Sequence, residues 1–157
     1  KKHTSEVMLK HLPKEVGIIS SHPMFGPDSF DSKARLKMMM DKTRVDDKIF
    51  NYWKTFFKNQ NINIIEMSPD EHDKIAARTQ GITHLLGRTL KNFGIQKTSI
   101  DTKGYRDLID LVEQTCNDTW ALYSDLQLYN PYTNTMLEDL KYSLNQIEDK
   151  LKENNDE

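Results

Sequence analysis

The sequence predicts an α/β layer followed by an all-α region. Short apolar runs typical of buried strands lie before residue 68, together with one amphipathic helix. Ser68-Pro69-Asp70-Glu71 then combines a capping residue, a proline at the first helical position and acids in the first turn. This is the strongest helix start in the chain. From there to the carboxyl end, apolar residues recur with helical spacing.

The α/β layer is expected to contain two helices and three strands. In order, they are a helix at 2–11, strands at 16–20 and 36–40, a helix at 46–60 and a strand at 62–67. In the second helix Ile49, Trp53 and Phe56 share one face, as in a helix that packs on a sheet. The run Met38-Met39-Met40 in the middle strand is more typical of core filler than of a metal or cofactor site.

The all-α region is expected to begin with one helix at 68–93, ended by Gly94. Gly81 and Gly87 inside it each cost about 1 kcal/mol relative to alanine, so they indicate either close approach of a ligand or helix, or simple tolerance. Further helical faces comprise Tyr105, Leu108, Ile109 and Val112; Trp120, Tyr123 and Leu126; and Leu137, Leu140, Leu144, Ile147 and Leu151. The last set has the a/d spacing of a coiled-coil seam, which indicates either a dimer contact or packing within the chain.

Composition excludes several classes of function. The 157 residues carry a net charge of −2 and the pI is about 6.2, so no basic field indicates binding to nucleic acid or to an anionic membrane. No apolar run approaches the roughly 20 residues that a membrane-spanning helix needs. The single cysteine, Cys116, cannot form an internal disulfide, which favours a reducing compartment.

Motif spacing does not support a metal or phosphate site. The five histidines are His3, His11, His22, His72 and His84, and none stands in an H-E-x-x-H arrangement. His72 and His84 are twelve residues apart, which is about 120° around a straight helix, so they cannot share one small ion. The sequence contains neither a G-x-G-x-x-G loop nor a P-loop.

His22 is the first candidate for chemistry. It follows the apolar run of the first strand and opens the loop His22-Pro23-Met24-Phe25-Gly26-Pro27. In open α/β sheets reactive groups collect outside the carboxyl ends of strands, and a histidine there can take a proton near neutral pH. The alternative is an ordinary surface loop in which a histidine precedes a proline.

Gln80 and His84 form a second candidate group. They are four residues apart on the predicted long helix, so their side chains project side by side from one face. An amide beside an imidazole suits a hydroxylated or carboxylated small molecule. The alternative is a solvated polar stripe.

Motifs in order along the chain resemble the prephenate/arogenate dehydrogenase family of tyrosine biosynthesis. They are the loop at 22–27, Met67-Ser68-Pro69-Asp70-Glu71-His72-Asp73, and Gln80-Gly81-Ile82-Thr83-His84. Downstream, Thr102-Lys103-Gly104-Tyr105, Leu111-Val112-Glu113 and Tyr129-Asn130-Pro131 are similar to the plant-type arogenate dehydrogenases. The resemblance covers nearly the whole chain. A 3-hydroxyacid-type dehydrogenase is disfavoured by the His22 loop.

The resemblance implies the organisation of the protein. Family members begin with a Rossmann half that carries the glycine-rich cofactor loop and a serine that partners the catalytic histidine. We expect this chain to lack that half and to be inactive by itself. It would comprise the C-terminal part of the nucleotide-binding domain (1–67) and a helical substrate-binding and dimerisation domain (68–157). The expected cofactor is NADP or NAD, the assembly a homodimer, and the compartment the cytoplasm or, in a plant-like host, a plastid.

The resemblance also implies the reaction, an oxidative decarboxylation of arogenate or prephenate with hydride transfer to a nicotinamide. His22 matches the base that removes the proton of the ring hydroxyl. The matched substrate positions are Gln80, His84, Thr102 and Lys103, and Asp28 and Ser29 are expected to line the pocket. Many bacterial members also use an arginine, for which no counterpart is evident here. Asp73 is expected to be a structural acid at a helix start.

Asp118 matches the position where plant-type arogenate enzymes carry an acid and prephenate-preferring relatives carry asparagine. A carboxylate there would attract the ammonium of arogenate, which prephenate lacks. The resemblance therefore implies a preference for arogenate and inhibition by tyrosine, which carries the same ammonium. Two alternatives stay open: Asp118 only caps the helix that starts near Thr119, and the chain is a non-catalytic dimerisation or tyrosine-binding module.

Overall fold

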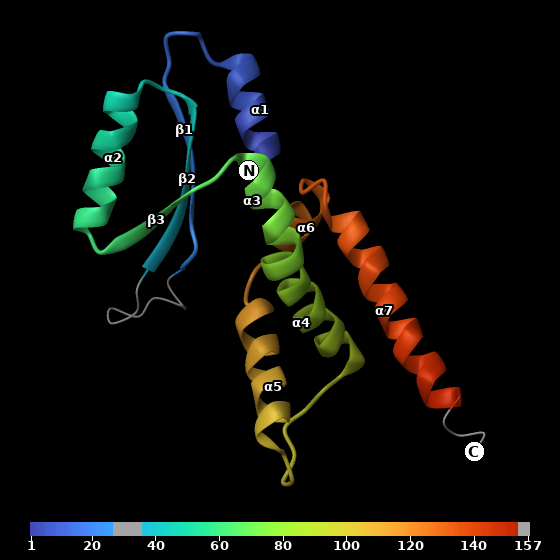
Figure 1. The fold of residues 1–157 in the computed structure, drawn as a ribbon. Coiled ribbons are helices and arrows are strands. Elements are labelled where there is room, and N and C mark those ends of the chain that lie inside the picture. Colours follow the sequence, from blue (N-terminus) through green and yellow to red (C-terminus); the bar gives the residue numbers. More distant parts are fainter. Residues whose placement is uncertain (27–35, 154–157) are drawn as a thin grey trace. The chain divides into compact units, whose positions relative to one another are not determined.

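The computed structural model describes residues 1–26 and 36–153, which form two compact units. The first unit runs from Lys1 to Ile75 and contains the sheet, and the second begins at Ala76 and is helical. Figure 1 shows the elements of each unit. Compact units need not coincide with the domains of a whole protein, so the boundary expected after residue 67 stays a prediction.

The first unit is built on a three-stranded sheet in the order β1-β2-β3. Its strands are β1 (Ile18–Pro23), β2 (Leu36–Arg44) and β3 (Ile62–Glu66). β1 pairs antiparallel with β2, whereas β2 and β3 are parallel. Parallel strands need a crossover connection, and α2 (Asp47–Asn59) provides it on one side of the sheet (Figure 1).

The core of the first unit lies between the sheet and α2. Met38 and Met40 of β2 are buried with Phe50 of α2 in one apolar cluster. Met39 is equally buried, and strand geometry directs it to the opposite face. The three consecutive methionines therefore fill space on both faces of the central strand, and the expectation that they are core residues is confirmed.

β1 differs from the strand expected at 16–20. It begins at Ile18 and extends to Pro23, because antiparallel pairing with β2 continues through Ser21↔Met40 and His22↔Met39. His22 therefore stands near the end of a paired strand instead of in a loop. Pairing on one side restrains the backbone beneath a candidate catalytic side chain.

Two helices complete the first unit. α1 (Lys2–His11) ends before Pro13, as expected, and α3 (Pro69–Ala76) starts after Ser68. The hydroxyl of Ser68 accepts a hydrogen bond from the backbone N–H of Glu71 at 3.1 Å, which is the predicted capping interaction.

The helical unit starts with a π-helical turn. The single helix expected at 68–93 is continuous but consists of α3, the π-helix η2 (Ala77–Gly81) and α4 (Ile82–Phe93). Gly94 ends α4 in the left-handed conformation with φ of 89°, the predicted stop signal. α5 (Lys103–Thr115), α6 (Trp120–Leu128) and α7 (Thr133–Glu153) follow.

Gly87 allows α4 and α5 to approach closely. A Cβ built on Gly87 would lie 1.9 Å from Oγ1 of Thr115 and 3.0 Å from its Cβ. These distances are shorter than van der Waals contact, so the absence of a side chain sets the spacing of the helices. Of the two interpretations of Gly87, close approach of another helix is confirmed.

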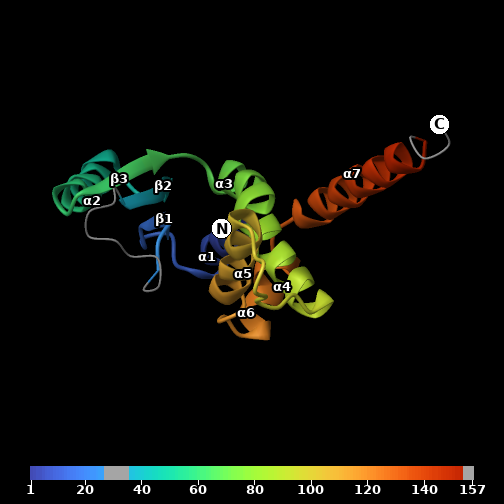
Figure 2. The ribbon, with the colours of Figure 1, turned by 90° about the horizontal axis from the view of Figure 1, so that it is seen from below.

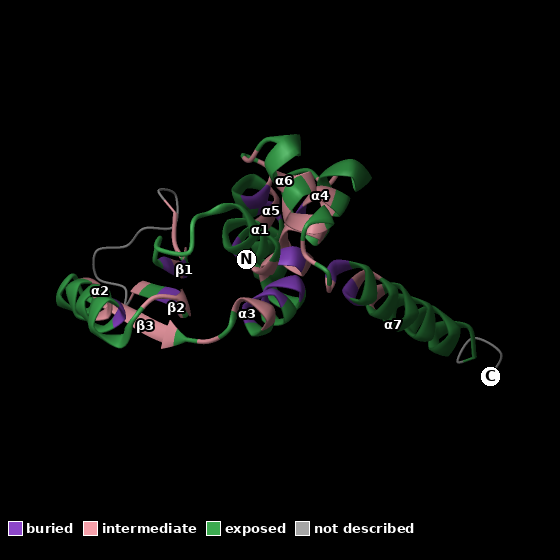
Figure 3. Cartoon of the chain, turned by 90° about the horizontal axis from the view of Figure 1, so that it is seen from above, coloured by how far each residue is buried: buried purple, intermediate pink, exposed green. Residues whose placement is uncertain are grey.

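α7 is exposed along most of its length. Thr133 and Met136 are buried at its start, whereas Leu144, Ile147 and Leu151 are exposed. Figure 2 shows α7 leading away from α4, α5 and α6, and Figure 3 shows its exposed surface in green. Among the described residues no helix is long and apolar enough to cross a membrane.

Candidate active site

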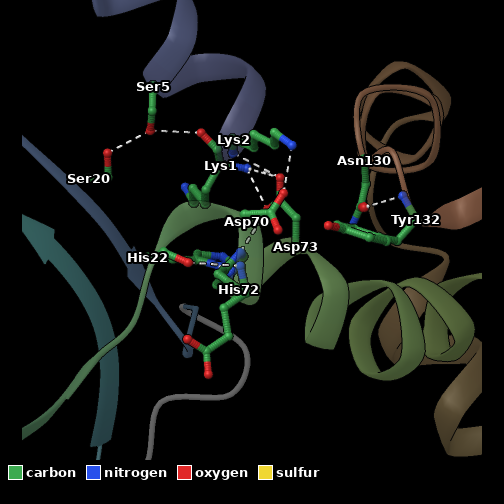
Figure 4. Close-up of polar contacts among 12 residues, drawn as sticks. Lys1, Lys2, Ser5, Ser20, His22, Asp70, His72, Asp73, Asn130 and Tyr132 are labelled. Carbon is green, nitrogen blue, oxygen red and sulfur yellow. Dashed lines mark hydrogen bonds and ion pairs between the residues drawn. The ribbon is translucent and has the colours of Figure 1, made fainter. Parts of the chain in front are cut away.

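The partly buried His22 ring contacts the buried imidazole of His72. Nδ1 of His22 lies 2.8 Å from Nε2 of His72, within hydrogen-bond distance. The ring centroids are 4.9 Å apart and the planes meet edge to face at 66°. β1 supplies one ring and α3 the other, so the contact joins residues fifty positions apart in sequence (Figure 4).

His72 also contacts Asp73, its neighbour on α3. The Nδ1 of His72 lies 2.8 Å from Oδ1 of Asp73, and the two residues are only 6% and 2% exposed. The Asp73 carboxylate accepts hydrogen bonds from the main-chain nitrogen of Lys1 at 2.7 and 2.9 Å and from the backbone N–H of Lys2 at 2.9 Å. A carboxylate at the N-terminus of α1 is also favoured by the helix dipole.

These contacts set the ionisation of Asp73. Burial opposes its charged form, but the hydrogen bonds from His72 and from the main-chain nitrogens of Lys1 and Lys2 outweigh burial and lower the pKa of Asp73 from 3.8 to about 2. Asp73 is therefore an ionised acceptor throughout the neutral range. Its expected structural role at a helix start becomes more specific, because it joins the start of α1 to α3.

The pKa of His22 is shifted in the direction that keeps the imidazole neutral. Burial is the main cause, followed by the positive charge of Lys1 and the neighbouring His72, and together they lower the pKa of His22 from 6.5 to about 4. Asp73 acts in the opposite direction but more weakly. At neutral pH the imidazole is unprotonated, the form that a general base requires.

A second polar group lies in the helical unit. Nδ1 of His84 on α4 is 3.7 Å from Oδ2 of Asp118, in the turn before α6. This distance is too long for a hydrogen bond, and the buried Nδ1 of His84 has no hydrogen-bond partner among the described residues. Buried polar atoms usually have one, so Nδ1 of His84 has unused hydrogen-bonding capacity beside the Asp118 carboxylate.

Asp118 is not the cap of α6. The N-cap is Thr119, whose hydroxyl accepts a hydrogen bond from the backbone N–H of Leu122 at 3.2 Å. The alternative in which Asp118 only caps this helix is therefore wrong. The carboxylate of Asp118 is available to face His84 instead.

Arg88 fixes the turn that carries Asp118. Its Nη2 donates to the backbone carbonyl of Asp118 at 2.6 Å. Its guanidinium carbon lies 5.6 Å from the ring centre of Trp120 and 4.8 Å from that of Tyr123, within the range of cation–π attraction. Arg88 follows His84 by one helical turn, so α4 both carries His84 and holds the position of Asp118.

Comparison with known proteins shows which proteins the chain resembles. Residues 89–157 match the family model "TYRAAT1-like, C-terminal domain". Arogenate dehydrogenase 2, chloroplastic, from Arabidopsis thaliana is 36% identical over 157 residues, which are 96% of this chain and 44% of that relative. Arogenate dehydrogenase from Synechocystis has a similar fold, with a TM-score of 0.65 at 16% identity, covering 97% of this chain and 67% of that one.

The chain is similar over nearly its whole length to the prephenate and arogenate dehydrogenases. Prephenate dehydrogenase from Aquifex aeolicus, solved with hydroxyphenyl propionate and NAD+, gives a TM-score of 0.66 at 16% identity over 88% of this chain and 53% of that one. The predicted family and the predicted fold, a Rossmann remnant followed by a helical domain, are confirmed. The chain spans less than half the length of the Arabidopsis relative.

Other predicted site residues of this chain have local partners. Thr102 caps α5 by accepting a hydrogen bond from the backbone N–H of Tyr105, and the exposed Lys103 pairs with Asp107 at 2.7 Å. Gln80 is half-buried in η2. Their contact with substrate stays a prediction. Asp28 and Ser29 lie outside the described residues.

The described residues do not fit the phosphates of a dinucleotide cofactor. An apolar pocket of the first unit, about 470 Å³, is lined mainly by Ile19, Met40, Val45, Ile49, Trp53 and Phe57. It offers no cluster of cationic groups or glycine-rich turn for a pyrophosphate. Across residues 1–26 and 36–153 there is also no group of three or more His, Cys, Asp or Glu side chains suited to a metal ion.

Sequence reasoning did not assign a role to His72 or to Arg88. His72 stands in the matched stretch 67–73, but only strand pairing and the placement of α3 bring it to His22. Arg88 is four residues after His84, and this spacing alone could have placed it on the face already under consideration.

Proposed function

We propose that the protein containing this chain catalyses the oxidative decarboxylation of arogenate, with prephenate the poorer substrate, and that His22 is the catalytic base. The supporting observation is the pairing of His22 Nδ1 with His72 near the end of β1, with the imidazole held neutral. A neutral imidazole with one nitrogen engaged presents the other nitrogen for proton transfer.

The proposed reaction divides the work between the cofactor and the chain. In this class of reaction the ring carbon bearing the hydroxyl loses a hydride, the carboxylate leaves as carbon dioxide, and the ring becomes aromatic. A bound nicotinamide, NADP or NAD, would supply the hydride acceptor. His22 removes the proton of the substrate hydroxyl as the C–O bond gains carbonyl character. The positive charge then lies on the imidazole of His22, which is already paired with His72.

Recognition of the substrate is assigned to the helical unit. Asp118 attracts the ammonium of arogenate, and His84 beside it at 3.7 Å engages a polar group of the same molecule. Gln80, one helical turn before His84, adds an amide, and Thr102 and Lys103 bind a substrate carboxylate. Because tyrosine keeps the ammonium, it competes for Asp118 and inhibits.

The direct test replaces the base. In the whole enzyme, His22→Asn keeps a hydrogen-bonding side chain but removes the titratable ring. We expect kcat to fall by about 10²–10⁴-fold, the usual contribution of a positioned base, and the acid limb of the kcat/KM profile to disappear. Cofactor affinity should stay unchanged. A variant with wild-type turnover and the same acid limb would refute the assignment.

A homodimer formed through the helical unit completes the proposal. The exposed apolar residues of α7, Leu144, Ile147 and Leu151, continue the predicted a/d seam. The same observation favours the second candidate function, a non-catalytic dimerisation or tyrosine-binding module. The two are separated by turnover of arogenate in the whole protein. The relative named as chloroplastic supports a plastid location in a plant-like host, with the cytoplasm as the alternative.

A further inference from the structure

Three side chains of the first unit, those of His22, His72 and Asp73, form a hydrogen-bonded chain. His22 Nδ1 is 2.8 Å from His72 Nε2, and His72 Nδ1 is 2.8 Å from Asp73 Oδ1. His72 is the central member and is 6% exposed. Each of its ring nitrogens therefore has one partner, as Figure 4 shows.

The Asp73 end determines where the hydrogens lie. An ionised carboxylate only accepts hydrogen bonds, and the oxygens of Asp73 already receive N–H groups from Lys1 and Lys2. Nδ1 of His72 must therefore carry a hydrogen and donate it to Asp73. In a neutral His72 ring, Nε2 then has the lone pair and can only accept.

The position of the ring hydrogen of His22 follows from its contact with His72. Since Nε2 of His72 accepts, Nδ1 of His22 must donate, and the lone pair of His22 is left on Nε2. We propose that His72 is a positioning residue that, anchored by Asp73, holds His22 in the Nδ1–H tautomer and so presents Nε2 as the proton acceptor. This inference rests on the proposed role of His22 as the base.

The same hydrogen bonds are compatible with the protonated state of His22. When Nε2 takes a proton, Nδ1–H still donates to His72, and no bond of the hydrogen-bonded chain has to reverse. The charge of Asp73 raises the proton affinity of His22 through space. The reverse polarity would require His72 to carry hydrogens on both nitrogens, and Nε2 of His22 would then carry a hydrogen and could not act as a base.

The tautomers can be read without substrate. We would label the chain with ¹⁵N-histidine and record long-range ¹H–¹⁵N spectra above pH 7, assigning His22 from the signals lost in His22→Gln. We expect hydrogen on Nδ1 and none on Nε2, in both His22 and His72. Hydrogen on Nε2 of His22, or on both nitrogens of His72, would overturn the proposal.

Two variants of His72 add a functional measurement in the whole enzyme. His72→Phe keeps a ring but removes the acceptor, whereas His72→Gln keeps an acceptor oxygen near the position of Nε2. We expect Phe to lower kcat by about 10–100-fold, the range seen for other residues that orient a functional imidazole, with KM unchanged, and Gln to restore most of the rate. Equal rates in wild type and His72→Phe would contradict the proposal.

The two measurements separate this inference from the proposed function. If the whole enzyme turns over neither arogenate nor prephenate, the proposed function fails, while the spectra of the wild-type chain still decide the tautomer of His22. If turnover is normal but His22 carries its hydrogen on Nε2, the role of His72 fails alone.

Discussion

Burial opposes the charged form of both His22 and Asp73, but the two side chains reach different ionisation states. Both side chains lose water, yet Asp73 gains enough N–H donors to stay ionised, and His22 loses its charge. The difference lies in their partners, because N–H donors stabilise the carboxylate of Asp73, whereas the positive charge of Lys1 adds to burial in opposing a protonated His22. His22 is therefore neutral at neutral pH, as a base requires, and Asp73 is ionised.

The shifted pKa of His22 predicts a pH-dependent stability. Its pKa is 6.5 in the unfolded chain and about 4 in the folded one, so the unfolded state binds the additional proton between these values. The free energy of unfolding should therefore fall as pH is lowered from about 6.5 to 4. Asp73 adds its own loss only below 3.8, as pH approaches 2.

Urea denaturation of the chain at several pH values measures this effect. The control is His22→Gln, which keeps a polar side chain that does not titrate, and the difference between the two profiles isolates His22 from the other histidines. We expect that difference to change between pH 6.5 and 4. Parallel profiles would show that the imidazole titrates alike in both states.

Asp118 provides a test of substrate choice. Asp118→Asn keeps the shape of the side chain and its place in the turn held by Arg88, but removes the charge that attracts an ammonium. In the whole enzyme kcat/KM should shift toward prephenate and tyrosine inhibition should weaken. Opposite charges about 4 Å apart gain roughly 4 kcal/mol at an effective dielectric of 20, before desolvation is subtracted, so the shift should be at least tenfold.

Competition assays with both substrates give this ratio. A matched control is Asp110→Asn, which removes an exposed carboxylate from α5. It should leave the ratio of the two kcat/KM values unchanged. If Asp118→Asn also leaves it unchanged, recognition of the ammonium lies elsewhere.

Several helices and strands follow from local patterns, and others depend on packing. The cap at Ser68, the stop at Gly94 and the three buried methionines are local signals, and each appears in the structure. The extension of β1 to Pro23 depends on β2, which lies beyond the next loop. The π-turn at 77–81 has no periodic signal, because one extra residue in a turn leaves the apolar spacing on either side intact.

The packing of α4 on α5 predicts the cost of filling Gly87. Gly87→Ala places a Cβ against Thr115, so the helices must separate or the threonine must move. Overpacking of this kind costs typically about 1–3 kcal/mol, more than the gain of about 1 kcal/mol that alanine brings to a helix. We expect a net loss of stability in urea denaturation.

Gly104 offers a matched control on α5. It also lies in a helix, but a Cβ there would meet nothing within 4 Å. Gly104→Ala should leave the free energy of unfolding unchanged or raise it. Equal stability of the two variants would mean that the α4–α5 contact adapts without cost.

For the molecule as a whole, the sequence predicted the family and the two kinds of structure better than the site. The family resemblance could be recognised from sequence because each motif is a contiguous stretch and the motifs occur in the expected order. The site does not follow in the same way, because His22–His72 and His84–Asp118 join residues that are far apart in sequence. Their distances depend on how strands pair and helices pack, which motif spacing does not encode.

The exposed seam of α7 predicts association of two copies. Leu144 and Ile147 are 68% and 57% exposed, and burying such side chains contributes about 1.5–3 kcal/mol each. The double variant Leu144→Glu/Ile147→Glu places charges on this face and should shift the chain to the monomer in light scattering at micromolar concentration. The control Asn145→Glu/Gln146→Glu adds the same charge at exposed positions beside the seam. A wild-type monomer, or equal dissociation of both variants, would show that α7 does not form the contact.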